Sequence, residues 1–346
     1  MKKLIILMAI PLFILGACQQ NKQKEEMKQT TAKDHYTFEL SDKVTRQKVT
    51  FKNRYGITLS GDLYIPKNSG NNLSALVISG PFGAVKEQSS GLYANQMAER
   101  GFAVLAFDPS YTGESGGEPR NVASPDINTE DFSAAVDYIG LQGNIDRNKI
   151  GIIGICGYGG FALNATAVDK RVKAVATTSM YDLSRVNAEG YFGSTTPEQR
   201  TKMLEEMSLQ RWEDAKNGTP KYPENGLAQT NEQSPQFVKE YYDYYKTDRG
   251  FHERSLNSNA AWTTTNSLSF MNMPLLTYIK EISPRPMLLI AGEKAHSRYF
   301  SEDAYKNASE PKELMIIPNG VHVDLYDKID VIPFAKLETF FKDNLK

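Results

Sequence analysis

Short apolar runs alternate along the chain with segments whose apolar residues recur at helical spacing. Runs of five to seven apolar residues bounded by glycine, proline or polar residues are typical of buried strands. Segment 129–141, which carries Phe132, Val136 and Ile139 on one face, is typical of an amphipathic helix, with Thr129 as the expected N-cap. Strands that alternate with helices predict an α/β fold with a doubly wound, mostly parallel sheet. The predicted strands are 73–79, 102–107, 150–155, 172–178, 286–291 and 313–317, after an antiparallel hairpin over 44–65.

The alternation stops between residues 183 and 283, where β-branched runs are rare and polar residues are frequent. We expect this segment to be a helical lid inserted into a core formed by 44–182 and 284–346, with helices over 197–212 and 235–245. The second helix carries the aromatic cluster Tyr241, Tyr242, Tyr244 and Tyr245. These rings could line a pocket or pack the lid's own small core, and packing is the commoner role for such a cluster.

The first residues have the pattern of an exported protein. Two lysines precede an apolar stretch over 4–15 that is too short to span a membrane stably, so 1–17 is interpreted as a signal peptide. Leu15-Gly16-Ala17-Cys18 resembles the lipobox of bacterial lipoproteins, which implies a lipid on Cys18 and a cell-envelope location outside the cytoplasm. The polar segment 18–43 is then expected to be a tether between the membrane and the fold.

The amino-acid composition restricts the classes of ligand that this protein is expected to bind. The 346 residues have a formal net charge of −1, and the body of the chain has no dense Lys/Arg run, so nucleic acid is not expected as a ligand. Neither metal-ligand spacing nor a phosphate-binding glycine loop is present, so we expect no metal and no cofactor. A small-molecule substrate is the expected partner. If Cys18 carries a lipid, Cys156 is the one remaining thiol.

Cys156 lies in a stretch, 149–160, in which an apolar run ends in a group of glycines. Gly154-Ile155-Cys156-Gly157-Tyr158 fits the frame G-x-Nu-x-G of the nucleophile elbow, in which a tight strand-to-helix turn exposes the nucleophile. Tyr158 departs from this frame, because the second residue after the nucleophile is usually small where helix and strand pack closely. A buried structural cysteine is the alternative interpretation.

The order of Cys156, an acid and then His322 resembles the α/β-hydrolase superfamily over residues 44–346. Loop 107–117 and the phrase 291–298 are similar to a bacterial subgroup of dienelactone-hydrolase-like and Xaa-Pro-peptidase-like proteins. Loop 108–117 lies where open α/β sheets place their ligands, but a structural turn is its favoured interpretation. The resemblance implies Cys156 as the nucleophile, His322 as the base, and the amides of Phe82 and Gly157 as the oxyanion hole.

Two carboxylates follow strands where the acid of such a triad can lie. Glu293 follows strand 286–291 and is favoured, whereas Asp182 follows strand 172–178 and is the alternative. The acid would orient His322, and an imidazole beside the thiol would favour the reactive thiolate.

The leading hypothesis is a membrane-tethered hydrolase that cleaves a small ester, lactone or thioester through an acyl-cysteine intermediate. An acyltransferase on the same scaffold is the second hypothesis. The third is a catalytically inactive hydrolase scaffold that binds a ligand, which the atypical Tyr158 favours.

Overall fold

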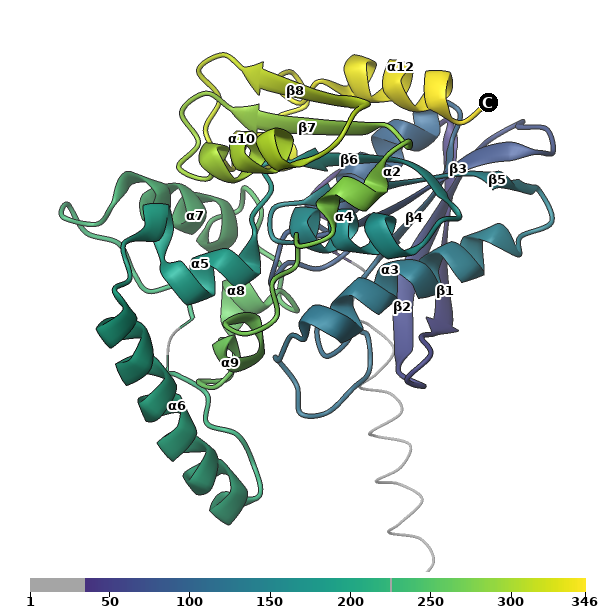
Figure 1. Ribbon diagram of the computed structural model, residues 1–346. Coiled ribbons are helices and arrows are strands. Elements are labelled where there is room, and N and C mark those ends of the chain that lie inside the picture. Colours follow the sequence, from purple (N-terminus) through teal and green to yellow (C-terminus); the bar gives the residue numbers. More distant parts are fainter. Residues whose placement is uncertain (1–34, 225) are drawn as a thin grey trace, which may run out of the picture. The chain divides into compact units, whose positions relative to one another are not determined.

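The computed structural model describes residues 35–346 except Asn225. The predicted signal peptide, Cys18 and tether residues 18–34 lie outside the described residues. Residues Tyr36–Lys346 form one compact unit, shown in Figure 1.

The centre of this unit is an eight-stranded sheet with the order β1-β2-β4-β3-β5-β6-β7-β8. The first two strands are antiparallel to their neighbours, and the other six are parallel to one another. The central strands are buried along their whole apolar stretch, as expected for strands covered on both faces. The strands are β1 Val44–Lys52, β2 Thr58–Pro66, β3 Leu73–Ser79, β4 Ala103–Phe107, β5 Ile145–Ile155, β6 Val172–Thr178, β7 Met287–Gly292 and β8 Lys312–Ile317.

Helices cover the sheet on both faces. On one face α3 (Pro125–Gly140) packs beside α4 (Tyr158–Val168), and on the other α2 (Ser89–Glu99) packs beside α12 (Phe334–Asn344). The parallel strands all end at the same edge of the sheet, so the loops after β3, β5, β6, β7 and β8 meet there. Two further helices follow the last strands, α10 (Arg298–Asn307) after β7 and the short α11 (Asp324–Asp327) after β8.

Between β6 and β7 the described residues form only helices, turns and loops. The longest helix of this insertion, α6, projects away from the sheet in Figure 1. It begins with a complete capping box, in which Thr196 and Gln199 bond each other's backbone amides. The elements of this insertion are α5 Leu183–Glu189, η1 Tyr191–Gly193, α6 Pro197–Asn217, α7 Gln236–Lys246, α8 Leu256–Asn259, α9 Ser267–Phe270 and η2 Ile279–Ile282.

Two sequence-based expectations need correction. Helix α3 starts four residues before Thr129, because Ser124 caps it and Pro125 occupies its first position. The expected tether extends too far, because the segment 36–43 belongs to the compact unit. Its Tyr36 hydroxyl donates to Asp62 at 2.9 Å, and the Thr37 amide donates to the Glu87 carbonyl at 3.0 Å. Helix α10 was not predicted from the sequence.

Loop 108–117, after β4, is held by buried charges. Lys86 Nζ lies 3.3 Å from Asp108 and 2.6 Å from Glu114, and the Asp108 carboxylate also accepts the backbone amide of Glu114 at 2.9 Å. These contacts give the loop a structural role. In the part of the chain that the structure describes, no helix combines the length and apolarity needed to cross a membrane.

Candidate active site

Cys156 occupies the sharp turn between β5 and α4. Its φ of 55° lies in the left-handed region that L-residues other than glycine rarely adopt. The turn is held from both sides, because the Cys156 amide donates to Thr178 of β6 at 2.9 Å and its carbonyl accepts the amides of Gly159 and Tyr181. The sequence therefore folds into the expected elbow, with the thiol at the helix N-terminus.

Tyr158 is accommodated in this elbow by an aromatic environment. The ring is buried among aromatic side chains, with its centroid 4.9 Å from that of Phe161. Gly159 takes the position of closest approach instead: a Cβ there would lie 2.4 Å from the Cβ of Met180. The small residue that the elbow needs is therefore one position later than the usual frame places it.

His322 lies in the loop after β8 and is fully buried. Its Nδ1 is 2.5 Å from the Ser297 hydroxyl, and its Nε2 is 2.8 Å from the Tyr326 hydroxyl. Both ring nitrogens therefore have hydroxyl partners, which fix the plane of the imidazole.

The structure brings neither predicted carboxylate to His322. Glu293 is exposed, and its Oε2 accepts the backbone amide of Asn319 at 2.8 Å. Asp182 caps α5 by accepting the Arg185 amide at 3.0 Å. Ser297 holds the place expected for the acid, because the chain after β7 continues in a turn past Glu293 before α10 begins. The expectation of Glu293, with Asp182 as alternative, is corrected on this geometry.

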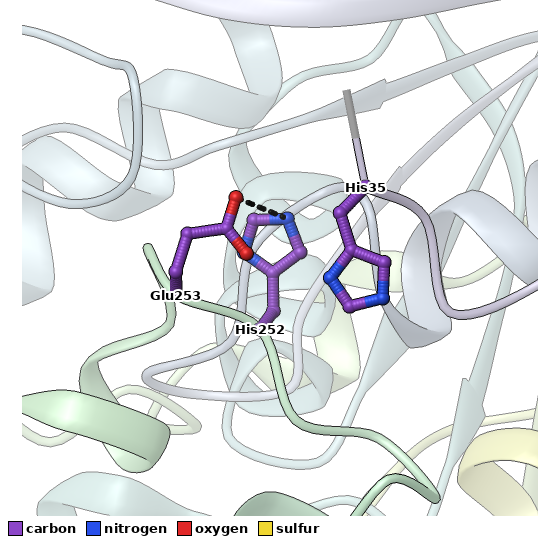
Figure 2. Close-up of side chains that lie close together, drawn as sticks. All are labelled: His35, His252 and Glu253. Atoms are coloured by element: carbon purple, nitrogen blue, oxygen red, sulfur yellow. Dashed lines mark ion pairs between the residues drawn. The ribbon is translucent and has the colours of Figure 1, made fainter. Parts of the chain in front are cut away.

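The other described histidines have different surroundings. His252 is buried in the insertion, where its Nδ1 accepts the Arg254 amide. Its Nε2 lies 3.9 Å from the Glu253 carboxylate, and Figure 2 shows this pair. His296 is closer to the site: its ring centroid lies 5.1 Å from that of His322, and its Nε2 contacts the Tyr181 hydroxyl. Of these histidines, His322 is the one whose hydroxyl partner, Tyr326, is close enough to the Cys156 sulfur to influence the pKa of the thiol.

The backbone amides of Phe82 and Gly157 lie close enough to the Cys156 sulfur to oppose the rise in the pKa of the thiol. The loop that carries Phe82 is fixed by the insertion, since Asn257 Nδ2 donates to the Phe82 carbonyl at 2.7 Å and the Asn257 amide donates to the Gly83 carbonyl at 3.1 Å. Two amides that converge on the thiol also converge on the oxygen of an acyl group bound to it.

The thiol opens into a cavity of about 230 Å³ between the sheet edge and the insertion. Its described lining residues include no Lys, Arg, Asp or Glu, so the cavity is apolar with a set of hydroxyl groups. The lining residues are Phe82, Cys156, Tyr181, Leu183, Val186, Tyr191, Leu227, Tyr241, Tyr245, Asn257 and Tyr326. Of the aromatic cluster noted in the sequence, Tyr241 and Tyr245 line this cavity, whereas the buried Tyr244 does not.

Burial sets the charge state of the site. It raises the pKa of the Cys156 thiol, against the smaller opposing effect of Tyr326 and the two amides. Burial, and then the neighbouring His296, hold the pKa of His322 well below its usual value. The pair is therefore neutral at neutral pH, and the preformed thiolate expected from the sequence is not favoured. Burial also lowers the pKa of His296 to about 4.

Sequence reasoning missed two residues of this site, Ser297 and Tyr326. Ser297 stands in the phrase 291–298 that carried the family resemblance. No sequence signal indicated Tyr326, because His322 lies in the turn before α11 and helical spacing does not relate the two residues.

Comparison with known proteins places this geometry in a family. A model of the X-Pro dipeptidyl-peptidase (S15) family matches residues 55–323. The chain is 66% identical to the uncharacterized protein PA2218 of Pseudomonas aeruginosa over 89% of its own length and 83% of that protein. The crystal structure of PA2218 superimposes with a TM-score of 0.89 at 64% identity, covering 91% of this chain and 98% of that one.

Two fungal proteins with assigned activities are more distant. The polyketide transferase grgF of a Penicillium species is 27% identical over 81% of this chain and 90% of its own length. Its crystal structure, that of an α/β-hydrolase, has a TM-score of 0.71 at 24% identity, covering 87% of this chain and 99% of that one. The thiohydrolase aneE of Aspergillus aculeatus is 36% identical over 39% of this chain and 42% of its own length.

These matches confirm the predicted fold and the predicted likeness to Xaa-Pro peptidases, whereas the dienelactone-hydrolase likeness stays a prediction. Three findings agree with one another: the elbow at the end of a central parallel strand, the histidine after the last strand, and the family match over most of the chain. The chain belongs to the X-Pro dipeptidyl-peptidase (S15) family and is an enzyme of the α/β-hydrolase fold.

Proposed function

We propose that this enzyme is a cysteine-dependent acyl hydrolase that cleaves an ester, lactone or thioester through an acyl-cysteine on Cys156. The observation that carries the proposal is the placement of the Cys156 thiol, which faces the cavity and lies close to the amides of Phe82 and Gly157. A sulfur in that position can attack a carbonyl whose oxygen enters the same pair of amides. His322 supplies the base.

The acyl group is proposed to be uncharged and largely apolar. A charged group in this cavity would lose its hydration without gaining an ionic partner, because no charged side chain lines the wall. The same point argues against X-Pro dipeptides as substrates: the cavity offers no carboxylate to bind the ammonium of a free peptide N-terminus. The volume of about 230 Å³ suits a short acyl chain or one ring.

Acyl transfer is the second candidate, and the apolar cavity favours it. An acyl-cysteine in a cavity with few polar groups is partly protected from water, so an alcohol or amine acceptor could compete for it. The likeness to the polyketide transferase grgF supports this alternative. Product analysis of one acyl thioester, with and without added alcohols and amines, separates hydrolysis from transfer.

The test of the nucleophile uses a panel of short acyl thioesters and p-nitrophenyl esters. Cys156→Ala should abolish turnover, and intact-mass spectrometry of the wild type should detect one acyl group, mapped to Cys156. Neutral hexanoyl esters should react faster than succinyl esters of similar length. Undiminished turnover in Cys156→Ala would refute the proposal, and binding of esters without any turnover by the wild type would favour the ligand-binding hypothesis.

We further propose that the enzyme is anchored to a bacterial membrane by a lipid on Cys18, facing outside the cytoplasm. The Leu15-Gly16-Ala17-Cys18 run and the polar residues after it support this proposal. Cell fractionation should find the wild type with membranes and should find Cys18→Ala unprocessed. A wild-type protein recovered wholly in the soluble fraction would contradict the anchor.

A further inference from the structure

The hydroxyl of Tyr326 lies between the histidine and the cysteine of the site. It is 2.8 Å from His322 Nε2, it lines the same cavity as Cys156, and it is close enough to the sulfur to oppose the rise in the pKa of the thiol. Tyr326 is fully buried, and its ring packs edge-on against those of His322 and Tyr244 at centroid distances of 5.3 and 5.0 Å. The packed ring leaves the hydroxyl little freedom to move away from either partner.

From this arrangement we propose that Tyr326 is a catalytic residue that relays the thiol proton of Cys156 to His322. The inference rests on the proposed function, because it assigns a role in the acylation of Cys156. It differs from a simple triad, in which the histidine would take the proton from the nucleophile directly.

The relay requires one tautomer of His322, with its proton on Nδ1 and with Nε2 as an acceptor. The Ser297 hydroxyl, 2.5 Å from Nδ1, can accept that proton's hydrogen bond. For the relay, the Tyr326 O–H is assigned as the donor to Nε2, which leaves the Tyr326 oxygen able to accept the S–H of Cys156 as the reaction begins. The three groups therefore form one directed chain from the thiol to the imidazole while all of them are neutral.

Acylation of Cys156 by this path involves two coupled proton transfers. As the sulfur lone pair forms the S–C bond to the acyl carbonyl, the S–H bond breaks and its proton moves to the Tyr326 oxygen. The original Tyr326 proton moves to His322 Nε2, so the tyrosine is neutral before and after. The imidazolium then returns a proton by the same path to the leaving alcohol or thiol. No free tyrosinate forms, which suits a site where burial holds the pKa of Tyr326 well above its usual value.

A second tyrosine hydroxyl near the sulfur does not provide an equivalent path. Tyr241 also lies close enough to the Cys156 sulfur to affect the pKa of the thiol, but its hydroxyl leads to Tyr181 and through it to His296. Burial lowers the pKa of His296 to about 4, and two tyrosines separate it from the sulfur. Tyr326 is the shorter path to a base.

The test is Tyr326→Phe, which removes the hydroxyl and keeps the ring. Single-turnover acylation by a hexanoyl thioester should fall by about 10²-fold or more, the usual contribution of a proton-transfer group. The matched control is Tyr244→Phe, a buried tyrosine of the same cluster that does not line the cavity, which should acylate at the wild-type rate. Both variants are checked for folding by thermal denaturation.

A proton inventory in mixtures of H₂O and D₂O provides a readout that lost packing would not change. Two protons in motion predict a curved plot for the wild type, and the residual reaction of Tyr326→Phe should give a straight one. An unchanged rate, or the same curvature in both proteins, would overturn the relay while leaving Cys156 as the nucleophile. Full turnover by Cys156→Ala would instead show that the proposed function itself is wrong.

Discussion

At the scale of single residues, the site combines a strained backbone with a low-polarity environment. The positive φ of Cys156 is a conformation that costs on the order of 1–3 kcal/mol and persists where the surrounding structure enforces it. Here its amide and carbonyl are both bonded to neighbouring segments. Burial then keeps the thiol protonated, so reactivity depends on proton removal during the reaction and not on a stored thiolate.

This charge state predicts the pH dependence. Because the pKa of Cys156 is raised, alkylation by iodoacetamide at pH 7 should be slower than that of a free cysteine and should rise steeply with pH above 9. Because the pKa of His322 is depressed, the base stays neutral as the pH falls below 6.5, so acylation should hold its rate from pH 8 to below pH 6. Stopped-flow acylation measures this profile. A rate that halves near pH 6.5, or fast alkylation at pH 7, would contradict the neutral pair.

The partner of His322 Nδ1 gives a second prediction. Ser297→Ala should lower kcat by about tenfold, because it removes one buried hydrogen bond that orients the ring. Glu293→Gln should be nearly silent, since Glu293 is exposed and bonds Asn319. Asp182→Asn should leave both kcat and the melting temperature nearly unchanged, because asparagine caps a helix about as well as aspartate does. Steady-state kinetics of the three variants show which residue supports His322. A loss of several orders of magnitude in kcat for Glu293→Gln would identify Glu293 as the acid.

At the scale of elements, the insertion holds one half of the expected oxyanion hole in place. Helix α8 approaches the loop after β3 closely, and Gly83 there has a φ of 84° and no room for a Cβ, which would lie 2.5 Å from Asn257 Oδ1. Ser255 adds a hydrogen bond of 3.0 Å to the Gly83 carbonyl. The position of the Phe82 amide is therefore determined by contacts from the insertion as well as by the strand before it.

Asn257→Ala should release this loop. We expect kcat to fall by on the order of tenfold to a hundredfold with a smaller change in KM, since a misplaced donor weakens the transition state more than the bound substrate. Asn259→Ala is the control, because Asn259 is exposed at the end of the same helix and bonds Glu253. Equal losses in kcat for both variants would indicate general disruption of α8 instead of a role for Asn257.

At the scale of the whole molecule, a buried ionic cluster joins the insertion to the core. Lys86 is fully buried and contacts Glu87 at 2.6 Å as well as Asp108 and Glu114, and Arg254 of the insertion contacts Glu87. Burial opposes the charge on Lys86, but the three carboxylates outweigh it and raise its pKa. Removing one partner of such a cluster costs more than the intact cluster contributes, because the remaining charges stay buried.

Lys86→Met should therefore destabilise the fold by about 3–5 kcal/mol, measured by urea denaturation of the purified protein. The control is Lys342→Met, which breaks the exposed pair with Glu338 within α12 and should cost on the order of 0.5 kcal/mol or less. A loss for Lys86→Met as small as that of the control would show that the cluster does not hold the insertion to the core.

The sequence by itself determined which segments of the chain form strands, the elbow at Cys156 and the histidine after the last strand. These features are local: a β-branched run, a glycine turn or a loop after a strand is specified by neighbours in sequence. The insertion was also visible, because a loss of strand periodicity over about a hundred residues is a local signal. Its helices α6 and α7 begin where the pattern predicted, at Pro197 and Gln236, to within one residue.

Only the tertiary structure decided which groups reach His322 and what charge they carry. Glu293 and Ser297 both follow β7, and the direction of the turn there determines that the hydroxyl, not the carboxylate, faces the ring. Tyr326 acquires its place beside His322 through contacts of α11 with distant segments, including the ring of Tyr244 and the ion pair between Asp327 and Arg249. The neutral state of Cys156 and His322 comes from desolvation by the assembled insertion and core, an effect summed over segments that are distant in sequence and therefore absent from any short motif.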